Sequence, residues 1–542
     1  MLKIVPLTSK VVFCTLLITL LGCQPDTSRT RLSQRGIVYC GQSALTTLNP
    51  QLSHDNQAIN QLGSQIFERL LDIDPNSHHP LPALAKSWEV SNDRLAYTFY
   101  LRQGVSFQSA AGFAPSRFLN ADDVVFSFKR IIDPTHPFHY VSGGRYPWFE
   151  SLGFANLVAD IVAESPYSVT FFLKRTDNAF LSILATAPAV IHSQEYADYL
   201  VASNQASKID HHPLGSGPFN FIEYKENSHI RLQRHWGYWQ GAAKMEQVVF
   251  DLSTRGVGRL AKLLTGECDI IDSPHTSQIA VIINDPDYEL RRQTGLNVSY
   301  LAINQRSEKV ADPLIRKAIL TAIDRQKVIN SVLHGAGSIA DSILPPASWA
   351  FDSQRPRVGY NPKIAKAYLD NSRYQFEEAL QLAFFSRNDD MGGSPHKTAE
   401  LIQSDLAAIG LKVELTMLNP QDSFVLDNSF SYDLLLTSWR AANGDPDSFL
   451  RPILSCDAIN VGTNNSQWCN LQFDNLLELA LKTNQEKQRM NYYRLAQDVI
   501  EQHTPVIPLL HSHNYQAHHR SIGGVQLSPF GTRSFVTVYR SE

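Results

Sequence analysis

Apolar positions along the chain recur with two different spacings, which predict strands and helices in alternation. Short apolar runs such as residues 297–304 (NVSYLAIN) are typical of buried strands, whereas residues 56–71 place apolar side chains three and four positions apart, as on one face of a helix. Residues 120–123 (NADD) are typical of a helix start. Residues 315–333 are expected to form one long amphipathic helix, and residues 476–503 are helical with a polar face. This alternation indicates an α/β fold.

One predicted strand leads into a loop that is suited to contacting a ligand. Residues 433–437 (DLLLT) form a short apolar run, Trp439 follows it, and residues 443–447 (NGDPD) are rich in turn-forming residues. Clefts in α/β proteins form at the carboxyl ends of strands, so this loop with its aromatic residue is a candidate binding site. A well-capped turn beside a core tryptophan would produce the same local pattern.

The first residues form a targeting segment rather than part of the fold. Two lysines precede the apolar run 11–21, which is too short to span a bilayer stably. The run ends in Leu-Leu-Gly-Cys, the pattern at which bacterial lipoproteins are cleaved and lipid-modified. We therefore predict a signal peptide over residues 1–22, lipidation of Cys23 and a flexible polar tether over residues 23–35. A signal peptide that is cut nearby without lipidation is the alternative.

Length and composition describe an ordinary globular protein with more than one lobe. The chain has 542 residues, which is too many for one hydrophobic core, so two or three lobes are expected. Its formal charge of −4 gives no indication of nucleic-acid binding. The 18 histidines are scattered, and the chain has no HExxH or GxSxG motif, so neither a metal site nor a catalytic residue is predicted. Histidine and serine side chains could still meet in space, so an exported hydrolase stays as a remote alternative.

Cysteines of an exported protein are expected to form disulfides. Besides Cys23 and the cysteine of the signal peptide, the chain has Cys40, Cys268, Cys456 and Cys469, which allow three pairings. Cys456 and Cys469 close a short loop, which favours a local bridge and leaves Cys40 to pair with Cys268. A zinc site is the rival interpretation, but no CxxC motif or cluster of histidine and cysteine supports it.

Six blocks of sequence resemble the periplasmic peptide-binding proteins of ABC importers, the oligopeptide/dipeptide class of extracellular solute-binding proteins. The blocks are LPALAKSW (81–88), residues 97–107, NADDVVF (120–126), GSGPF (215–219), LTGECD (264–269) and GDPDSF (444–449). The resemblance covers nearly all of the chain after the tether. Residues 259–269 and 445–452 are most similar to the Sap-type peptide transport proteins within this family.

The resemblance implies an α/β fold of the periplasmic binding protein type, with two ligand lobes across a hinge and an inserted third domain. Ligand would lie between the two lobes. The implied limits are 36–72, 205–295 and 511–542 for lobe I, 73–204 for the inserted domain (the insert) and 296–510 for lobe II. In dipeptide-binding relatives, two disulfides occur at spacings that match Cys40–Cys268 and Cys456–Cys469, in agreement with the pairing above.

The resemblance also implies which residues contact the ligand. Trp439 matches a tryptophan of the family directly, and Arg440 and Asn443 lie beside it in the same loop. Such relatives hold the α-amino group of a peptide with an acidic residue three positions after the tryptophan, because a desolvated ammonium needs a carboxylate partner. That position is Ala442 here, which predicts weak dependence on a free peptide N-terminus. Arg387 is the nearest match to an arginine that binds the peptide carboxylate.

By the same resemblance, the protein captures peptides in the periplasm of a Gram-negative bacterium and delivers them to an inner-membrane ABC permease. It would act as a monomer held to the membrane by its N-terminal lipid, without a cofactor, and cationic antimicrobial peptides are one expected ligand class. The acids Asp445 and Asp447 belong to the turn and are expected to serve structure. A non-peptide ligand such as haem or an oligosaccharide is the alternative, which Ala442 makes more credible.

Overall fold

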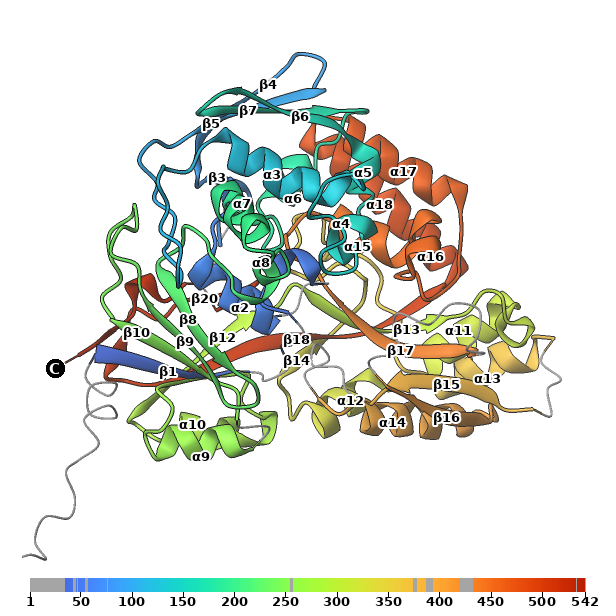
Figure 1. The fold of residues 1–542 in the computed structure, drawn as a ribbon. Helices are drawn as coiled ribbons and strands as arrows, with labels where there is room; N and C mark the ends of the chain where they lie inside the picture. The colour runs from blue at the N-terminus through green and yellow to red at the C-terminus, as the bar shows by residue number, and fades with distance from the viewer. Residues whose placement is uncertain are drawn as a thin grey trace, which may run out of the picture.

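The structure is a computed structural model that describes residues 35–41, 45, 47–53, 57–75, 77–253, 257–373, 378–386, 393–419, 432–532 and 534–541. Within these ranges, no helix combines the length and the apolar character that crossing a membrane requires. A long mixed β-sheet runs across the lower half of the molecule with helices beneath it, and further helices with a second sheet lie above it (Figure 1).

Lobe I contributes one half of the long sheet. Its strands lie in the order β11 (Ile270–Asp272), β1 (Gly36–Cys40), β10 (Gln247–Asp251), β9 (His229–Arg234) and β8 (Phe219–Lys225). β1 pairs in parallel with β10 and β11, whereas β10, β9 and β8 are antiparallel. The helices α9 (Gly258–Leu264) and α10 (Ile279–Ile283) lie below this half, and α2 (Gln57–Ile66) lies above it (Figure 1).

Lobe II contributes the other half of the sheet. Its strands lie in the order β16 (Val413–Leu418), β15 (Leu380–Phe385), β17 (Leu434–Arg440) and β13 (Asn297–Ile303). β13 is buried along its whole length, as its continuous apolar run predicts. The helices that share an apolar core with these strands are α11 (Pro313–Ala322), α12 (Arg325–Val332), α13 (Pro362–Asp370) and α14 (Pro395–Ala407).

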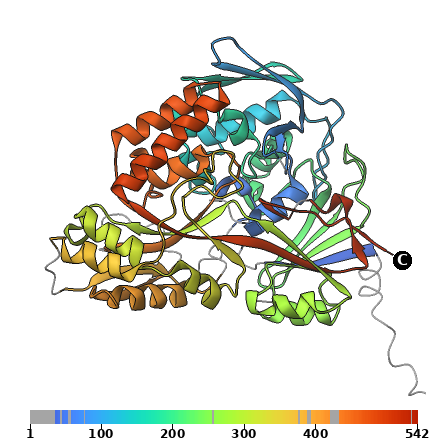
Figure 2. The same ribbon diagram turned by 180° about the vertical axis from the view of Figure 1, so that it is seen from behind.

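A single long strand joins the two halves. The first half of β18 (Val506–His519) pairs with β13 and β14 (Gly337–Ile339), and its second half pairs with β12 (Tyr288–Thr294) and β11. At the crossover, the Asn297 side chain donates to the carbonyl of Ser512 at 3.0 Å and accepts from its N–H at 2.8 Å. The predicted limit between the lobes at residues 510 and 511 therefore falls inside a continuous strand (Figure 2).

The insert forms a second, antiparallel sheet with its own helices. Its strands lie in the order β4 (Ala85–Val90), β5 (Ala96–Leu101), β7 (Ser168–Leu173) and β6 (Val158–Ser165). α3 (Ala121–Ile132) packs against this sheet. It starts where predicted, because the Asn120 side chain accepts from the N–H of Asp122 and the Asp123 carboxylate accepts from the N–H of Asn120.

Four helices of lobe II lie beside the insert above the sheet. They are α15 (Asp447–Leu454), α16 (Asp457–Val461), α17 (Leu471–Lys482) and α18 (Glu486–His503) (Figure 1). Apolar side chains of the insert and of these helices belong to one core, in which Trp148 and Tyr493 are fully buried. The insert and lobe II thus meet directly in this layer.

Two segments that were expected to be helical are each interrupted. Residues 315–333 form α11 and α12 rather than one helix, so that prediction is wrong. The chain leaves the helical conformation at Ile323, and the Asp324 side chain then caps α12. Residues 476–503 are helical but cover most of α17 and all of α18, with a short break between them. Apolar periodicity identifies helical residues, but it continues across a short break.

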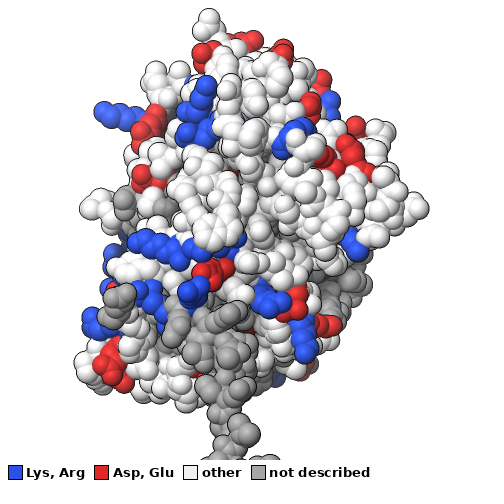
Figure 3. Space-filling model, turned by 60° about the vertical axis from the view of Figure 1, so that its left-hand side comes forward, with Lys and Arg blue, Asp and Glu red and all other residues white. Residues whose placement is uncertain are grey.

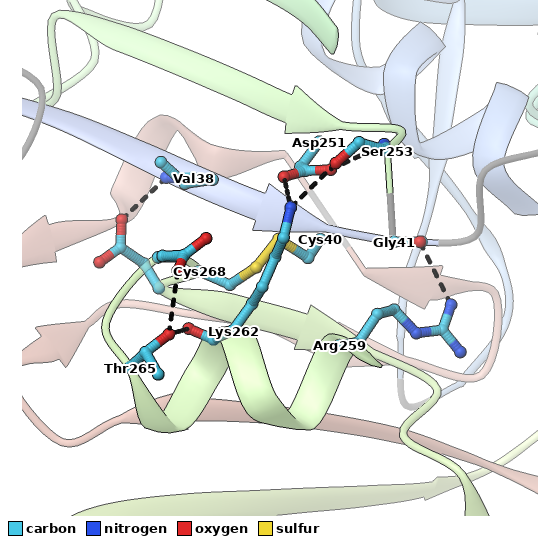
Figure 4. Close-up of a disulfide and its surroundings, with 11 residues drawn as sticks. Val38, Cys40, Gly41, Asp251, Ser253, Arg259, Lys262, Thr265 and Cys268 are labelled. Atoms are coloured by element: carbon cyan, nitrogen blue, oxygen red, sulfur yellow. Dashed lines mark hydrogen bonds and ion pairs between the residues drawn. A yellow bond between two sulfur atoms is a disulfide. The ribbon is translucent and has the colours of Figure 1, made fainter. Parts of the chain in front are cut away.

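Both predicted disulfides are present. Cys40 is bonded to Cys268 with Cα atoms 5.9 Å apart, and Cys456 is bonded to Cys469 with Cα atoms 4.6 Å apart. Figure 4 shows that the first bond ties β1 to the chain just after α9. Among the described residues, the one group with metal-ligand geometry is Cys40, Asp251 and Cys268. Its sulfur atoms are bonded to each other and its carboxylate pairs with a lysine of α9, so the zinc interpretation is not supported.

Charged side chains are mixed on the surface that Figure 3 shows. Basic and acidic residues lie interspersed among uncharged ones on this face. This agrees with the small formal charge of −4. A ligand that approaches this face therefore meets local charges rather than an extended field of one sign.

Candidate functional site

A cavity of about 340 Å³ lies where lobe I, the insert and lobe II meet. This volume is within the range of small-molecule binding pockets, roughly 300–1,000 Å³. Its polar lining residues are Asn60, Gln61, Ser64, Glu68, Arg69, Asp72, Tyr238, Gln240, Arg440, Gln526, Ser528, Ser534 and Thr537. Apolar surface comes from residues such as Phe67, Val190 and Phe530. A ligand here would contact all three parts of the molecule at once.

Lobe II reaches the cavity through the carboxyl end of β17. The strand ends at Arg440, and the N–H of Ala441 donates to the carbonyl of Leu296 at 2.9 Å. Arg440, Ala441 and Ala442 line the cavity, and the chain then turns away at Asn443. The structure therefore places a candidate site at the end of this strand, as the position of the loop in the sequence predicts.

The five residues predicted to bind ligand are in three different situations. Arg440 and Ala442 line the cavity. Trp439 and Asn443 are buried behind its wall, and neither is among the lining residues. Arg387 lies outside the described residues. A ligand-binding role for all five stays a prediction.

Trp439 is held by packing and by the turn that follows it. It lies inside β17 rather than after the strand, and its indole N–H donates to the carbonyl of Ser448 at 2.9 Å. Its ring stacks on that of Trp148 from the insert, with centroids 6.4 Å apart. Asn443 accepts from the N–H of Asp445 at 2.9 Å and donates to the carbonyl of Ser182 at 3.3 Å. Both side chains therefore support the cavity wall from behind.

The acids that follow Ala442 are paired with arginines of the lobe II helices. Asp445 accepts from Arg489 at 2.9 Å, and Asp447 accepts from Arg451 at 2.8 Å. Neither acid is a lining residue. Among the described residues, lobe II therefore brings no carboxylate to the cavity wall, in line with the alanine at position 442.

Arg440 brings a positive charge to the lobe II side of the cavity. Its guanidinium donates to the side-chain oxygen of Asn514 at 3.3 Å. It also acts on Asp272, a buried acid of lobe I. Burial raises the pKa of Asp272 to about 6, and the positive charges of Arg259 and Arg440 oppose this rise. The end of β17 thus places a guanidinium and no carboxylate beside Ala442 at the cavity wall.

Glu68 lines the cavity, and no sequence pattern pointed to it. It follows α2, and its carboxylate accepts from the indole of Trp239 at 2.7 Å, the hydroxyl of Ser216 at 2.8 Å and the hydroxyl of Tyr238 at 3.3 Å. These donors are all neutral. Burial raises the pKa of Glu68 to about 7, and the three hydrogen bonds only partly oppose this effect. The nearby Arg69 pairs with Asp72 at 2.8 Å.

Known proteins resemble this chain over nearly its full length. The model of the bacterial extracellular solute-binding proteins, family 5 (middle), matches residues 79–460. The peptide transport periplasmic protein SapA of Salmonella typhimurium is 40% identical over 95% of this chain and 94% of its own length. Heme-binding protein A of Haemophilus influenzae is 34% identical over 93% of this chain and 92% of its own.

A solved structure gives the same result for the fold. The dipeptide-binding protein of Pseudoalteromonas sp. SM9913, in complex with Met-Leu, superposes with a TM-score of 0.86 and 35% identity. The match covers 94% of this chain and 100% of that one. The two-lobed α/β architecture with an extra domain is therefore that of periplasmic binding proteins. The chain belongs to the bacterial extracellular solute-binding proteins of family 5.

Proposed function

We propose that the protein is the solute-binding component of an ABC importer, which captures peptides between its two lobes and delivers them to an inner-membrane permease. The observation that carries this proposal is the cavity at the end of β17, because it is built from both lobes and the insert. Relatives that share the fold include a peptide transport periplasmic protein and a dipeptide-binding protein. The family consists of solute-binding proteins rather than enzymes.

The cavity favours a peptide that is not anchored by its N-terminal amine on lobe II. Ala442 supplies no carboxylate there, and Arg440 beside it repels an ammonium group. Backbone hydrogen bonds to an extended peptide would give binding that tolerates different side chains. Affinity should therefore depend little on whether the N-terminus is free.

A non-peptide ligand is the second candidate, because a heme-binding protein is among the relatives. Haem iron is usually held by histidine, cysteine, methionine or tyrosine. The described residues that line the cavity include none of the first three. The one tyrosine, Tyr238, bonds through its hydroxyl to Glu68 and Gln240. These observations favour a peptide over haem.

The proposed location is the periplasm, with Cys23 carrying a lipid anchor and the protein acting as a monomer. The support for the anchor is the sequence pattern alone, because residues 1–34 lie outside the described residues. The relatives that are named as periplasmic proteins support the compartment.

Native mass spectrometry of the protein purified from its own envelope tests the ligand and the monomeric state together. A bound mass that fragments as a peptide is expected. A bound haem or oligosaccharide would overturn the peptide proposal and leave the fold unchanged.

Titration with Met-Leu and N-acetyl-Met-Leu then tests the missing amine anchor. The wild type should bind both with similar affinity. Ala442→Asp should bind Met-Leu about 10- to 100-fold more tightly than the wild type does, with no change in its affinity for N-acetyl-Met-Leu. The reason is that a charge-assisted hydrogen bond contributes about 1.5–3 kcal/mol. Ala442→Asn is the uncharged control. Equal and unchanged affinities of Ala442→Asp for the two peptides would contradict the reasoning.

A further inference from the structure

The insert is fixed to lobe I by buried polar contacts. The side chain of Gln108 donates to the carbonyls of Ile66 at 2.9 Å, Gly217 at 3.0 Å and Phe219 at 2.8 Å, and it accepts from the N–H of Gly215 at 3.1 Å. Both ends of the insert also continue directly into lobe I. Because breaking these buried bonds would leave polar groups without partners, the insert and lobe I are expected to move together.

One segment of the insert, residues 175–182, reaches across to the helices of lobe II. Asn178 of the insert lies against the C-terminal end of α17. The last carbonyls of a helix have no hydrogen-bond partners within the helix itself. Its N–H donates to the carbonyl of Leu481 at 3.0 Å, and its side-chain amide donates to Leu481 at 2.8 Å and to the carbonyl of Thr483. A side chain of the insert thus caps a helix of lobe II.

Ion pairs strengthen the same contact. Arg175 of the insert pairs with Glu478 of α17 at 3.1 Å, and Arg451 of α15 pairs with the same carboxylate at 3.2 Å. The carbonyl of Ser182 accepts from the side chain of Asn443, the residue after cavity-lining Ala442. The segment therefore contacts lobe II both at its helices and directly behind the ligand cavity.

We propose that residues 175–182 of the insert are a latch that holds lobes I and II closed around bound ligand and sets how long it is retained. The contacts join a part fixed to lobe I with helices of lobe II, so they must break when the lobes separate, together with the apolar contacts between the insert and lobe II in the same layer. The latch rests on the proposed function, because it requires lobes that open to release ligand.

Asp177 makes this latch depend on pH. Its side chain is buried, accepts from the N–H of Ala179 at 2.8 Å and faces Asp447 of α15. Burial raises the pKa of Asp177 to about 6, Asp447 adds to the rise, and Arg451 and Arg175 oppose it. The other titratable groups of this contact are Glu478 and Tyr97, and the Tyr97 hydroxyl donates to the backbone carbonyl of Asp177 at 3.3 Å.

Acid should therefore strengthen closure. In an open form, Asp177 is exposed and regains its ordinary pKa near 3.9. In the closed form the Asp177 carboxyl has a pKa of about 6 and binds its proton more tightly. The equilibrium between the open and closed forms therefore shifts toward the closed form as the pH falls through 6. Linkage between these two values makes closure about tenfold more favourable at pH 5 than at pH 7.5.

The experiment combines peptide release with small-angle X-ray scattering, at pH 5 and pH 7.5. Met-Leu should leave the wild type about tenfold more slowly at pH 5. Asn178→Ala should release it faster at both pH values, and Asp177→Asn should remove the pH dependence. Asn156→Ala and Asp198→Asn, at exposed positions of the insert, are the matched controls and should behave as the wild type. Thermal unfolding confirms that each variant is folded.

Scattering of the ligand-free protein separates the latch from the proposed function. The wild type should be more compact at pH 5 than at pH 7.5, whereas Asp177→Asn should have the same radius of gyration at both. This result would support the latch even if Met-Leu did not bind. If Asp177→Asn kept the full pH dependence, or if Asn178→Ala had the release rate and compactness of the wild type, the latch would be overturned.

Discussion

The carboxyl group of Glu68 should make the stability of the protein fall as the pH rises through neutrality. Burial raises its pKa to about 7 in the folded protein, against three opposing hydrogen bonds from Trp239, Ser216 and Tyr238. In the unfolded chain the pKa returns to about 4.3. The folded state therefore binds the proton more tightly. The resulting stability is fully present below the unfolded pKa and is lost as the pH rises through about 7.

The size of this loss follows from the two pKa values. Between pH 5 and pH 8.5, linkage predicts a fall of about 2.5 kcal/mol in the free energy of unfolding from this one group. Glu68→Gln keeps the size of the side chain but cannot ionise. The variant should therefore lack this part of the pH dependence of stability. Any stability that it loses through weaker hydrogen bonds should be the same at every pH.

Urea unfolding of the wild type and of Glu68→Gln at pH 5, 6.5 and 8.5, followed by tryptophan fluorescence, measures the effect. The difference in unfolding free energy between the two proteins cancels other titrating groups and should change by about 2.5 kcal/mol over this range. Glu226→Gln, at an exposed position, is the control, and its free energy of unfolding should change with pH as that of the wild type does. A difference that stays constant with pH would show that Glu68 ionises like an exposed acid.

Two further predictions concern the cysteines. Replacing Cys40 and Cys268 by serine should lower the free energy of unfolding by about 5 kcal/mol. The same replacement of Cys456 and Cys469 should lower it by about 3 kcal/mol. The first bond closes a loop of 228 positions and the second a loop of 13, and a longer loop restricts the unfolded chain more. Equal losses of unfolding free energy, measured by urea unfolding, would contradict this account. Cys23→Ser should move the protein from the membrane fraction to the soluble fraction; unchanged membrane attachment in a fractionation experiment would refute the lipid anchor.

Local sequence patterns predicted those structural features whose physical cause lies in residues close together in the chain. The continuous apolar run of β13 and the cap at Asn120 depend on residues that are close together in the chain, and the structure has both. The pairing of Cys456 with Cys469 follows in the same way from a short loop. The fold class and the family came from longer blocks of sequence, and comparison with known proteins confirms them.

The candidate site was only partly predictable for the opposite reason. The loop after β17 was identified, but the sequence could not show that Arg440 and Ala442 face the cavity while Trp439 and Asn443 support it from behind. That choice depends on the insert, whose Trp148 covers Trp439.

The sequence by itself determined the α/β binding-protein architecture, the disulfide pairing and the absence of a carboxylate at Ala442. The tertiary structure alone decided that Glu68 becomes a partly buried acid with a raised pKa, that Asn178 lies against the end of α17, and which groups surround Asp177. At each of these places a decisive partner lies more than a hundred positions away: Trp239 for Glu68, Leu481 for Asn178 and Asp447 for Asp177. Because a pKa or a helix end responds to whichever groups packing brings near, no local pattern encodes it.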